Sequence, residues 1–162
     1  MTRDQLLAAR TSAWTDDERA ALVAIVATLR PSAHHLGDAL DWLDDLAARD
    51  GGRPASALDR PELQAALAAP GSAPDRWKRW KEALRRLRYP RLAARERAFA
   101  AAVRALDLGR NVAIAPSPAF EGGRVTVTIR AATVDELVAS LDRLAEARAA
   151  DDLARLFALL DA

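Results

Sequence analysis

The residues most able to do chemistry are ten lysines and arginines between Arg76 and Arg97. This stretch reads RWKRWKEALRRLRYPRLAARER and holds 10 of the chain's 24 basic residues but only 2 of its 23 acidic ones, Glu82 and Glu96. Its formal charge is therefore +8, in a chain whose net charge is +1. The residues before it include 7 basic and 12 acidic side chains, and those after it 7 and 9. Cations concentrated in this way are typical of a surface that binds the phosphates of a nucleic acid.

The first half of this basic stretch is predicted to be an amphipathic helix. Its apolar residues follow a spacing of i, i+3, i+7 and i+10, which forms one stripe on a helix: Trp77, Trp80, Leu84 and Leu87. Pro74 suits the first turn of this helix and Pro90 stops it. A second helix is predicted from about Arg91, with cations in its first two turns. Cations there oppose the helix dipole, so they do not serve helix stability.

Eight cations of the stretch are the predicted nucleic-acid contacts: Lys78, Arg79, Lys81, Arg85, Arg86, Arg88, Arg91 and Arg95. Contacts of this kind position a protein on phosphates without reading sequence. Two alternatives stay open. The basic face could be a solvated surface that pairs with the acidic N-terminal half, or it could dock an acidic protein partner. Arginine supplies 22 of the 24 basic residues, so part of the richness in arginine is compositional.

No catalytic constellation is evident, and the expectation is a protein without enzymatic activity or cofactor. His34, Asp38 and Asp41 recur at i, i+4 and i+7 and could, with Asp45, resemble a metal patch. A polar outer helix face explains them equally, and a single helix cannot supply converging ligands, so no metal is expected. The adjacent aspartate pairs point about 100° apart on a helix and make poor acid–base dyads. Neither a phosphate-binding loop nor a nucleophile elbow is present.

The four tryptophans are predicted to be structural. Trp77 and Trp80 could stack on unpaired bases, but their spacing is more typical of a helical core. Trp14 and Trp42 are interpreted as core or interface residues.

Composition limits the class of protein. A chain of 162 residues forms one domain or two small ones and can bury a core without cross-links. The absence of cysteine excludes disulfides, thiol catalysis and zinc–thiolate sites. The N-terminus lacks the apolar segment of a secretory signal, and no run approaches the ~18 apolar residues of a membrane span. By elimination, a cytoplasmic protein without membrane association is expected.

The pattern of the whole chain predicts an α+β fold that is mostly helical. Residues 1–69 are expected to form a small helical bundle, with a capping box at Thr15 and Glu18. Residues 73–162 are expected to hold the basic helix and then a helix–strand–strand–helix unit. Its strands, 111–114 and 124–130, would form a two-stranded antiparallel hairpin. Thr133 and Glu136 form a second predicted capping box.

A lone hairpin has two open edges and little core, so it needs a partner. Pairing with the same hairpin of a second copy would give a homodimer with a continuous four-stranded antiparallel sheet. Alternatively, the N-terminal bundle could cover the sheet in a monomer.

Three segments, 106–114, 122–129 and 135–141, read LDLGRNVAI, GGRVTVTI and DELVASL. Together, over residues ~100–145, they resemble the C-terminal dimerisation domain of ParB-type chromosome-partitioning proteins. The resemblance implies dimerisation through a helix and a shared sheet, with non-specific DNA affinity. The chain departs from that family in three ways. The loop 116–121 has no lysine, no ParB-like nucleotide-binding motif or helix-turn-helix precedes the match, and a further helix follows it. The resemblance therefore does not imply centromere recognition or nucleotide hydrolysis.

Together these patterns predict a DNA-associated accessory protein that binds nucleic acid without sequence specificity, with no enzymatic activity. The alternative is a protein–protein adaptor whose basic helix docks an acidic partner.

Overall fold

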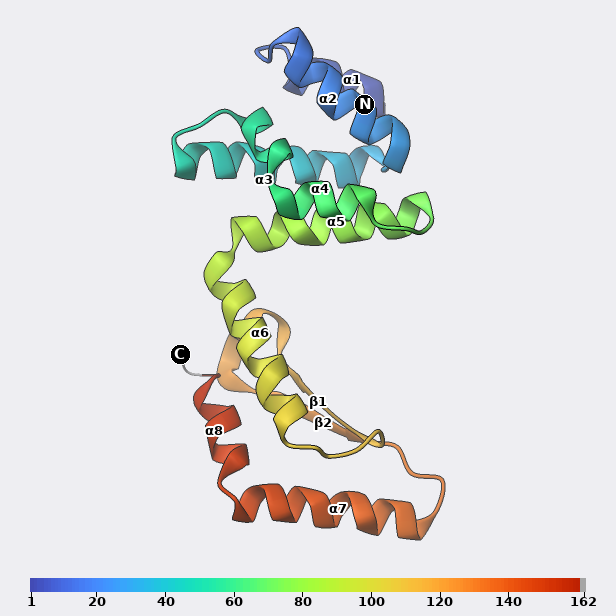
Figure 1. Ribbon diagram of the computed structural model, residues 1–162, viewed down its shortest axis with the longest axis vertical. Coiled ribbons are helices and arrows are strands. Elements are labelled where there is room, and N and C mark those ends of the chain that lie inside the picture. The colour runs from blue at the N-terminus through green and yellow to red at the C-terminus, as the bar shows by residue number, and fades with distance from the viewer. Residues whose placement is uncertain (161–162) are drawn as a thin grey trace. The chain divides into compact units, whose positions relative to one another are not determined.

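The computed structural model describes residues 1–160 and confirms the predicted fold class (Figure 1). The chain is 72% helical, with a two-stranded antiparallel hairpin between helices near its C-terminus, and is therefore α+β. It divides into two compact units, the N-terminal unit Met1–Pro90 and the C-terminal unit Arg91–Ala162.

The N-terminal unit is a helical bundle. It contains α1 (Arg3–Arg10), α2 (Asp16–Leu29), α3 (Ala33–Asp50), a 3₁₀ helix η1 (Pro54–Asp59), α4 (Pro61–Ala68) and α5 (Ala73–Arg88). Figure 1 shows α5 lying beside α3 and α4. The core is one apolar cluster whose largest fully buried members are Leu22, Leu29, Leu36, Leu40, Leu43, Leu63, Trp80 and Leu84.

The basic helix α5 belongs to this unit. The sequence placed the division between domains at residues 69–73, whereas the compact units divide after Pro90. The reason is the predicted apolar stripe of α5. Trp77, Trp80 and Leu84 are buried in the core of the bundle, and α5 packs against α2, α3 and α4.

Local capping explains where these helices begin. The predicted capping box of α2 is present: Thr15 accepts a hydrogen bond from the Glu18 amide (3.3 Å), and Glu18 accepts one from the Thr15 amide (2.8 Å). Ser32 and Ser72 cap α3 and α5 in the same way with their hydroxyls. An additional helix, α1, had no prediction from the sequence and begins with its own capping box at Thr2 and Gln5.

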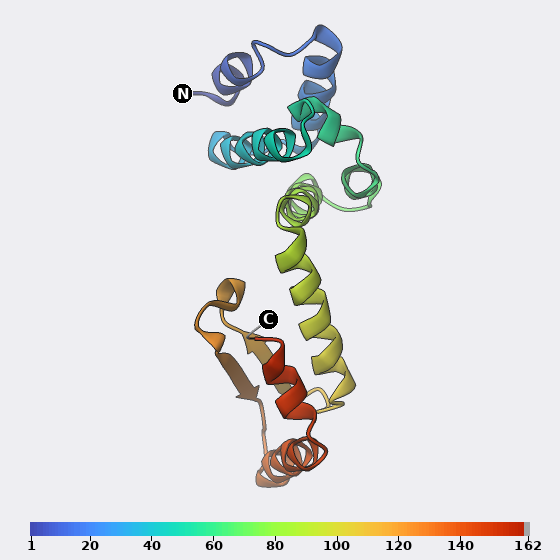
Figure 2. The ribbon, with the colours of Figure 1, turned by 90° about the vertical axis from the view of Figure 1, so that its left-hand side faces the viewer.

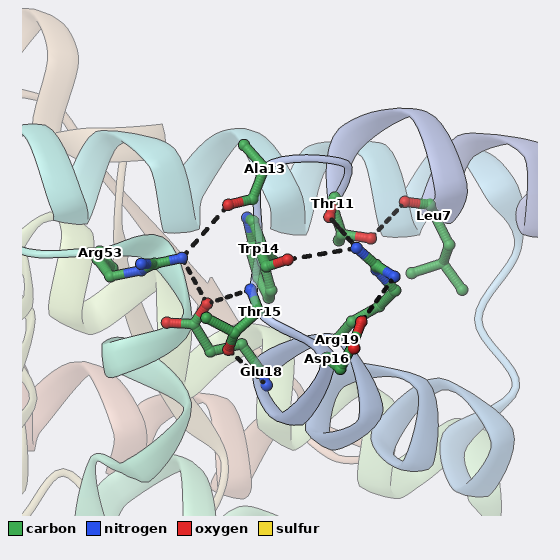
Figure 3. Close-up of polar contacts among 9 residues, drawn as sticks. All are labelled: Leu7, Thr11, Ala13, Trp14, Thr15, Asp16, Glu18, Arg19 and Arg53. Carbon is green, nitrogen blue, oxygen red and sulfur yellow. Dashed lines mark hydrogen bonds and ion pairs between the residues drawn. The ribbon is translucent and has the colours of Figure 1, made fainter.

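The connection between α1 and α2 is held by two arginines (Figure 3). Arg53 donates to the carbonyl of Ala13 (3.3 Å) and to the carboxylate of Glu18 (2.7 Å). Arg19 donates from the other side to the carbonyl of Trp14 (3.2 Å). These bonds satisfy backbone groups that no helix pairs, and they fix α1 in place on the bundle.

The C-terminal unit contains the hairpin and the helices that pack beside it. It contains α6 (Pro90–Ala105, beginning at the last residue of the other unit), β1 (Val112–Pro116), η2 (Pro118–Gly123), β2 (Val125–Ile129), α7 (Val134–Ala149) and α8 (Asp152–Ala158). The strands pair antiparallel, with Ile114 opposite Val127. Figure 2 shows α6 and α8 alongside the hairpin. Their shared core contains Phe99, Phe120, Leu156 and Leu160.

Helix α7 presents its apolar stripe to solvent. Val134, Leu137, Val138 and Leu141 are 74%, 40%, 48% and 49% exposed. The α7 residues that are buried carry small side chains, Ser140 and Ala147. A helix usually turns its large apolar side chains inward, so this exposed stripe is a feature that needs an explanation.

The second predicted capping box differs in detail from the structure. Thr133 caps α7 by accepting from the amide of Glu136 (3.2 Å), as expected. The Glu136 carboxylate, however, accepts from the amide of Ala132 (2.8 Å) and not from that of Thr133. The carboxylate thus satisfies an amide one residue further from the helix.

Candidate anion-binding groove

A groove of about 980 Å³ lies along α5 in the N-terminal unit. Six cationic side chains line it: Arg30, Lys78, Arg79, Lys81, Arg85 and Arg86. Two carboxylates, Asp75 and Glu82, are also present, so positive charge dominates. The apolar lining comes from Leu29, Pro31, Trp42, Pro74 and Trp77. We call this feature the α5 groove.

Helix periodicity and one turn bring the cations together. Lys78, Lys81 and Arg85 are three and four residues apart and so share a face of α5. The sixth cation, Arg30, comes from the turn between α2 and α3. It ends α2 in the left-handed conformation (φ 49°), and Pro31 prevents the helix from continuing.

Three of the groove's cations form ion pairs within the chain. Lys81 Nζ lies 2.5 Å from Asp38 Oδ2. Glu82 accepts two hydrogen bonds from Arg85 (2.8 and 2.9 Å) and one from Arg86 (3.0 Å). The Arg85 guanidinium, and after it Arg86, holds the pKa of Glu82 below its ordinary value, and Lys81 does the same for Asp38.

Three of the predicted contacts on the groove are exposed. Lys78 is exposed and makes no ion pair or hydrogen bond with the described residues, 1–160. Arg79 is exposed and donates one hydrogen bond to the carbonyl of Pro70. Arg86 is also exposed, apart from its contact with Glu82. These three side chains could exchange water or a weak partner for a phosphate at little cost.

Three of the eight predicted contacts do not line the groove. Arg88 pairs with Asp45 (2.5 Å) and lies over the ring of Tyr89. Arg91 is the first residue of the C-terminal unit and is exposed. Arg95, in the same unit, donates to the carbonyls of Leu159 (2.7 Å) and Leu160 at the end of the described chain. Its guanidinium also lies 4.7 Å from the centre of the Phe120 ring.

Pairing with acidic residues of the N-terminal half, which the sequence left as an alternative, accounts for part of the basic stretch. Four aspartates of α3 face cations of neighbouring helices: Asp38 pairs with Lys81, Asp41 and Asp44 with Arg10, and Asp45 with Arg88. Among the predicted nucleic-acid contacts, this explains Lys81 and Arg88. It does not explain Lys78, Arg79 or Arg86.

The tryptophans divide into core and groove residues. Trp77 and Trp80 are buried and stacked on each other, with ring centres 5.2 Å apart, as the core interpretation predicted. Trp42 is only half-buried and lines the groove, where Lys81 Nζ lies 5.2 Å from its ring centre. Sequence reasoning missed Trp42 and Arg30 as site residues, because no local pattern links them to a helix more than thirty positions away.

The aspartates of the possible metal patch are turned towards cations. Asp38 contacts Lys81, and Asp41 contacts Arg10. Within residues 1–160, no three histidine, aspartate or glutamate side chains converge as metal ligands would. In the same range, no helix combines the length and the apolar character needed to cross a membrane.

The groove is therefore a cationic site with an apolar side, built by α5, the first half of α3 as far as Trp42, and the turn before α3. Comparisons with family models, with curated proteins and with solved structures gave no match for this chain.

Proposed function

We propose that the α5 groove binds the phosphodiester backbone of a nucleic acid, most simply DNA, without sequence specificity and without catalysis. The observation that supports this most is the collection of six cations around one groove with only two carboxylates. Guanidinium groups match the geometry of phosphate oxygens, and lysine adds a point charge. The protein would then be an accessory protein that attaches to nucleic acid through its N-terminal unit.

The exposed cations are the natural first contacts. Lys78, Arg79 and Arg86 can each reach a phosphate without losing a buried partner. Lys81 and Arg85 would exchange carboxylate oxygens for phosphate oxygens and so contribute less. Of the eight residues predicted from the sequence, the proposal thus keeps the five that line the groove as contacts. Lys78, Arg79 and Arg86 are its main contacts.

The test is the salt dependence of binding. Anisotropy of a labelled random duplex is measured over a series of salt concentrations for the wild type and for Lys78→Gln/Arg86→Gln. Losing two phosphate contacts should reduce the log–log salt slope by about 1.8, because each contact contributes about 0.9 on B-DNA. The control is Arg104→Gln/Arg148→Gln, which removes two exposed arginines of the C-terminal unit. No binding of either a duplex or a single strand at low salt, or equal slopes for both double variants, would reject the proposal.

An acidic protein partner is the second candidate, and the apolar lining of the groove favours it. An acidic segment with apolar side chains would suit Trp42, Pro74 and the surrounding cations. Acidification separates the two candidates. Carboxylates of a protein partner are protonated below about pH 4 and would release the groove, whereas phosphodiesters stay charged. Glu82 also loses its charge as pH falls through its lowered pKa, which makes the groove more positive.

We also propose that the chain forms a homodimer through its C-terminal unit. The support is the exposed apolar stripe of α7, together with a hairpin in which each strand pairs with only one other among residues 1–160. The ParB-type resemblance predicts the same behaviour and stays a prediction.

A further inference from the structure

We infer that the α5 groove prefers a single strand to a duplex, with an unpaired base held against its apolar side. The inference rests on the proposed function and specifies its ligand. It comes from the presence of an apolar side next to the cations. A site that held phosphates by charge alone would not need the apolar side.

The apolar side is what distinguishes the two ligands. Among the apolar residues that line the groove, Trp42 is half-buried and Pro74 is exposed, whereas Leu29 and Pro31 are buried. A duplex keeps its bases stacked and paired and presents mainly sugars and phosphates, so Trp42 and Pro74 would stay in contact with water. A single strand can turn a base out of its stack and cover them while its phosphates meet the cations.

Trp42 is the residue placed to receive a base. It is the half-buried indole of the groove, whereas Trp77 is almost fully buried against Trp80. Lys81, held by Asp38, lies over one face of the Trp42 ring with its Nζ 5.2 Å from the ring centre, so a base would stack on the other face while its phosphate meets this cation. Stacking on tryptophan tolerates any base, which agrees with the lack of a base-reading element.

The size of the groove is suitable. At about 980 Å³ it lies at the upper end of the roughly 300–1,000 Å³ typical of small-molecule pockets. A base with its sugar and flanking phosphates is a ligand of this class, whereas a duplex would have to bind across the opening.

The experiment compares three labelled ligands on the full chain: a strand of deoxythymidines, an abasic strand with the same number of phosphates, and a duplex of equal length. The thymidine strand should bind about 5- to 150-fold more tightly than the abasic one, which corresponds to stacking of one base. Trp42→Ala should remove the difference between the thymidine and abasic strands, while Trp42→Phe should restore part of it. Thermal melts report whether Trp42→Ala folds, and the comparison of the strands on the wild type does not depend on it.

The possible outcomes separate the two proposals. If thymidine and abasic strands bind equally, with salt dependence retained, the base contact is rejected and the proposed function survives. If no strand or duplex binds at low salt, the proposed function itself fails. If polyglutamate of equal charge binds as tightly as the thymidine strand, the groove recognises charge alone and the inference is overturned.

Discussion

Glu82 is the residue that most directly opposes anion binding by the α5 groove. Its carboxylate accepts three hydrogen bonds from Arg85 and Arg86, both of which line the groove. These bonds lower its pKa, so it is fully charged at neutral pH. A phosphate entering the groove must compete with this carboxylate for the same guanidinium groups.

Replacing Glu82 by glutamine should therefore strengthen nucleic-acid binding. Without the carboxylate the groove loses a competing anion, so Arg85 and Arg86 should hold a phosphate more tightly and the salt slope should steepen by up to about 0.9 in total. Thermal stability should fall slightly, because partly exposed helix pairs contribute only about 0.3–0.5 kcal/mol each. Anisotropy and a thermal melt measure the two effects. Glu62→Gln, an exposed acid on α4, is the control. Weaker binding by Glu82→Gln would show that the carboxylate positions the arginines instead of competing with the ligand.

Arg95 illustrates how a cation can be structural although its sequence context is basic. It caps the final carbonyls of the described chain at Leu159 and Leu160 and contacts Phe120, which lies in the core of the C-terminal unit. A charged hydrogen bond of this kind is typically worth about 1.5–3 kcal/mol. The side chain has little freedom to contact a phosphate.

Arg95→Gln and Lys78→Gln should consequently have opposite effects. Arg95→Gln should lower the stability of the C-terminal unit and leave the salt slope of DNA binding unchanged. Lys78→Gln should reduce that slope by about 0.9 and leave stability unchanged, because Lys78 is exposed. Chemical denaturation followed by circular dichroism, together with the salt titration, distinguishes them. A reduced slope for Arg95→Gln would return Arg95 to the nucleic-acid contacts.

At the scale of elements, periodicity and capping predicted most of the fold. The stripe of Trp77, Trp80 and Leu84 is buried as its spacing indicated, and the Thr15 cap begins α2. These features depend on neighbours within a few residues, which a sequence displays directly. The short helix α1 has too few apolar positions for the same reasoning.

The candidate site was less predictable because it depends on contacts between distant elements. The sequence identified the cations of α5. It did not show which of them line the groove, or which of them form ion pairs with the aspartates of α3. Pairs such as Lys81 with Asp38 join residues 43 positions apart. Arg30 and Trp42 reach the groove only through the packing of α2 and α3 around α5. The outward orientation of the α7 stripe is likewise a result of packing and not of local pattern.

The exposed stripe of α7 predicts how the protein should associate. Leu137→Asp/Leu141→Asp should convert a homodimer into a monomer that is no less stable, because both side chains are at least 40% exposed. A stable interface needs roughly 800 Å² from each partner, so the stripe would require help from an adjacent surface such as the hairpin. Sedimentation velocity over a range of concentrations measures the change. Val23→Asp, at an exposed apolar position on α2, is the control. A wild type that is monomeric at every concentration would contradict the proposed dimer.

At the scale of the whole molecule, the proposed functions fall in different units. The α5 groove lies entirely in Met1–Pro90, and the exposed stripe and hairpin lie in Arg91–Ala162. Each unit has its own buried apolar cluster. A dimer would then carry two grooves, and a long strand contacting both would bind more tightly than a short one by effective concentration alone.

The separate clusters predict separate unfolding, and the tryptophans allow a direct test. All four, Trp14, Trp42, Trp77 and Trp80, belong to the N-terminal unit, so tryptophan fluorescence reports that unit alone. Leu156→Ala removes a fully buried side chain from the C-terminal core and should cost about 2–5 kcal/mol there. It should move part of the circular dichroism transition in denaturant without moving the fluorescence midpoint. Leu43→Ala, equally buried in the N-terminal core, should move the fluorescence midpoint instead. If Leu156→Ala shifts the fluorescence midpoint together with the circular dichroism transition, the chain unfolds as one cooperative body and the two units are not independent.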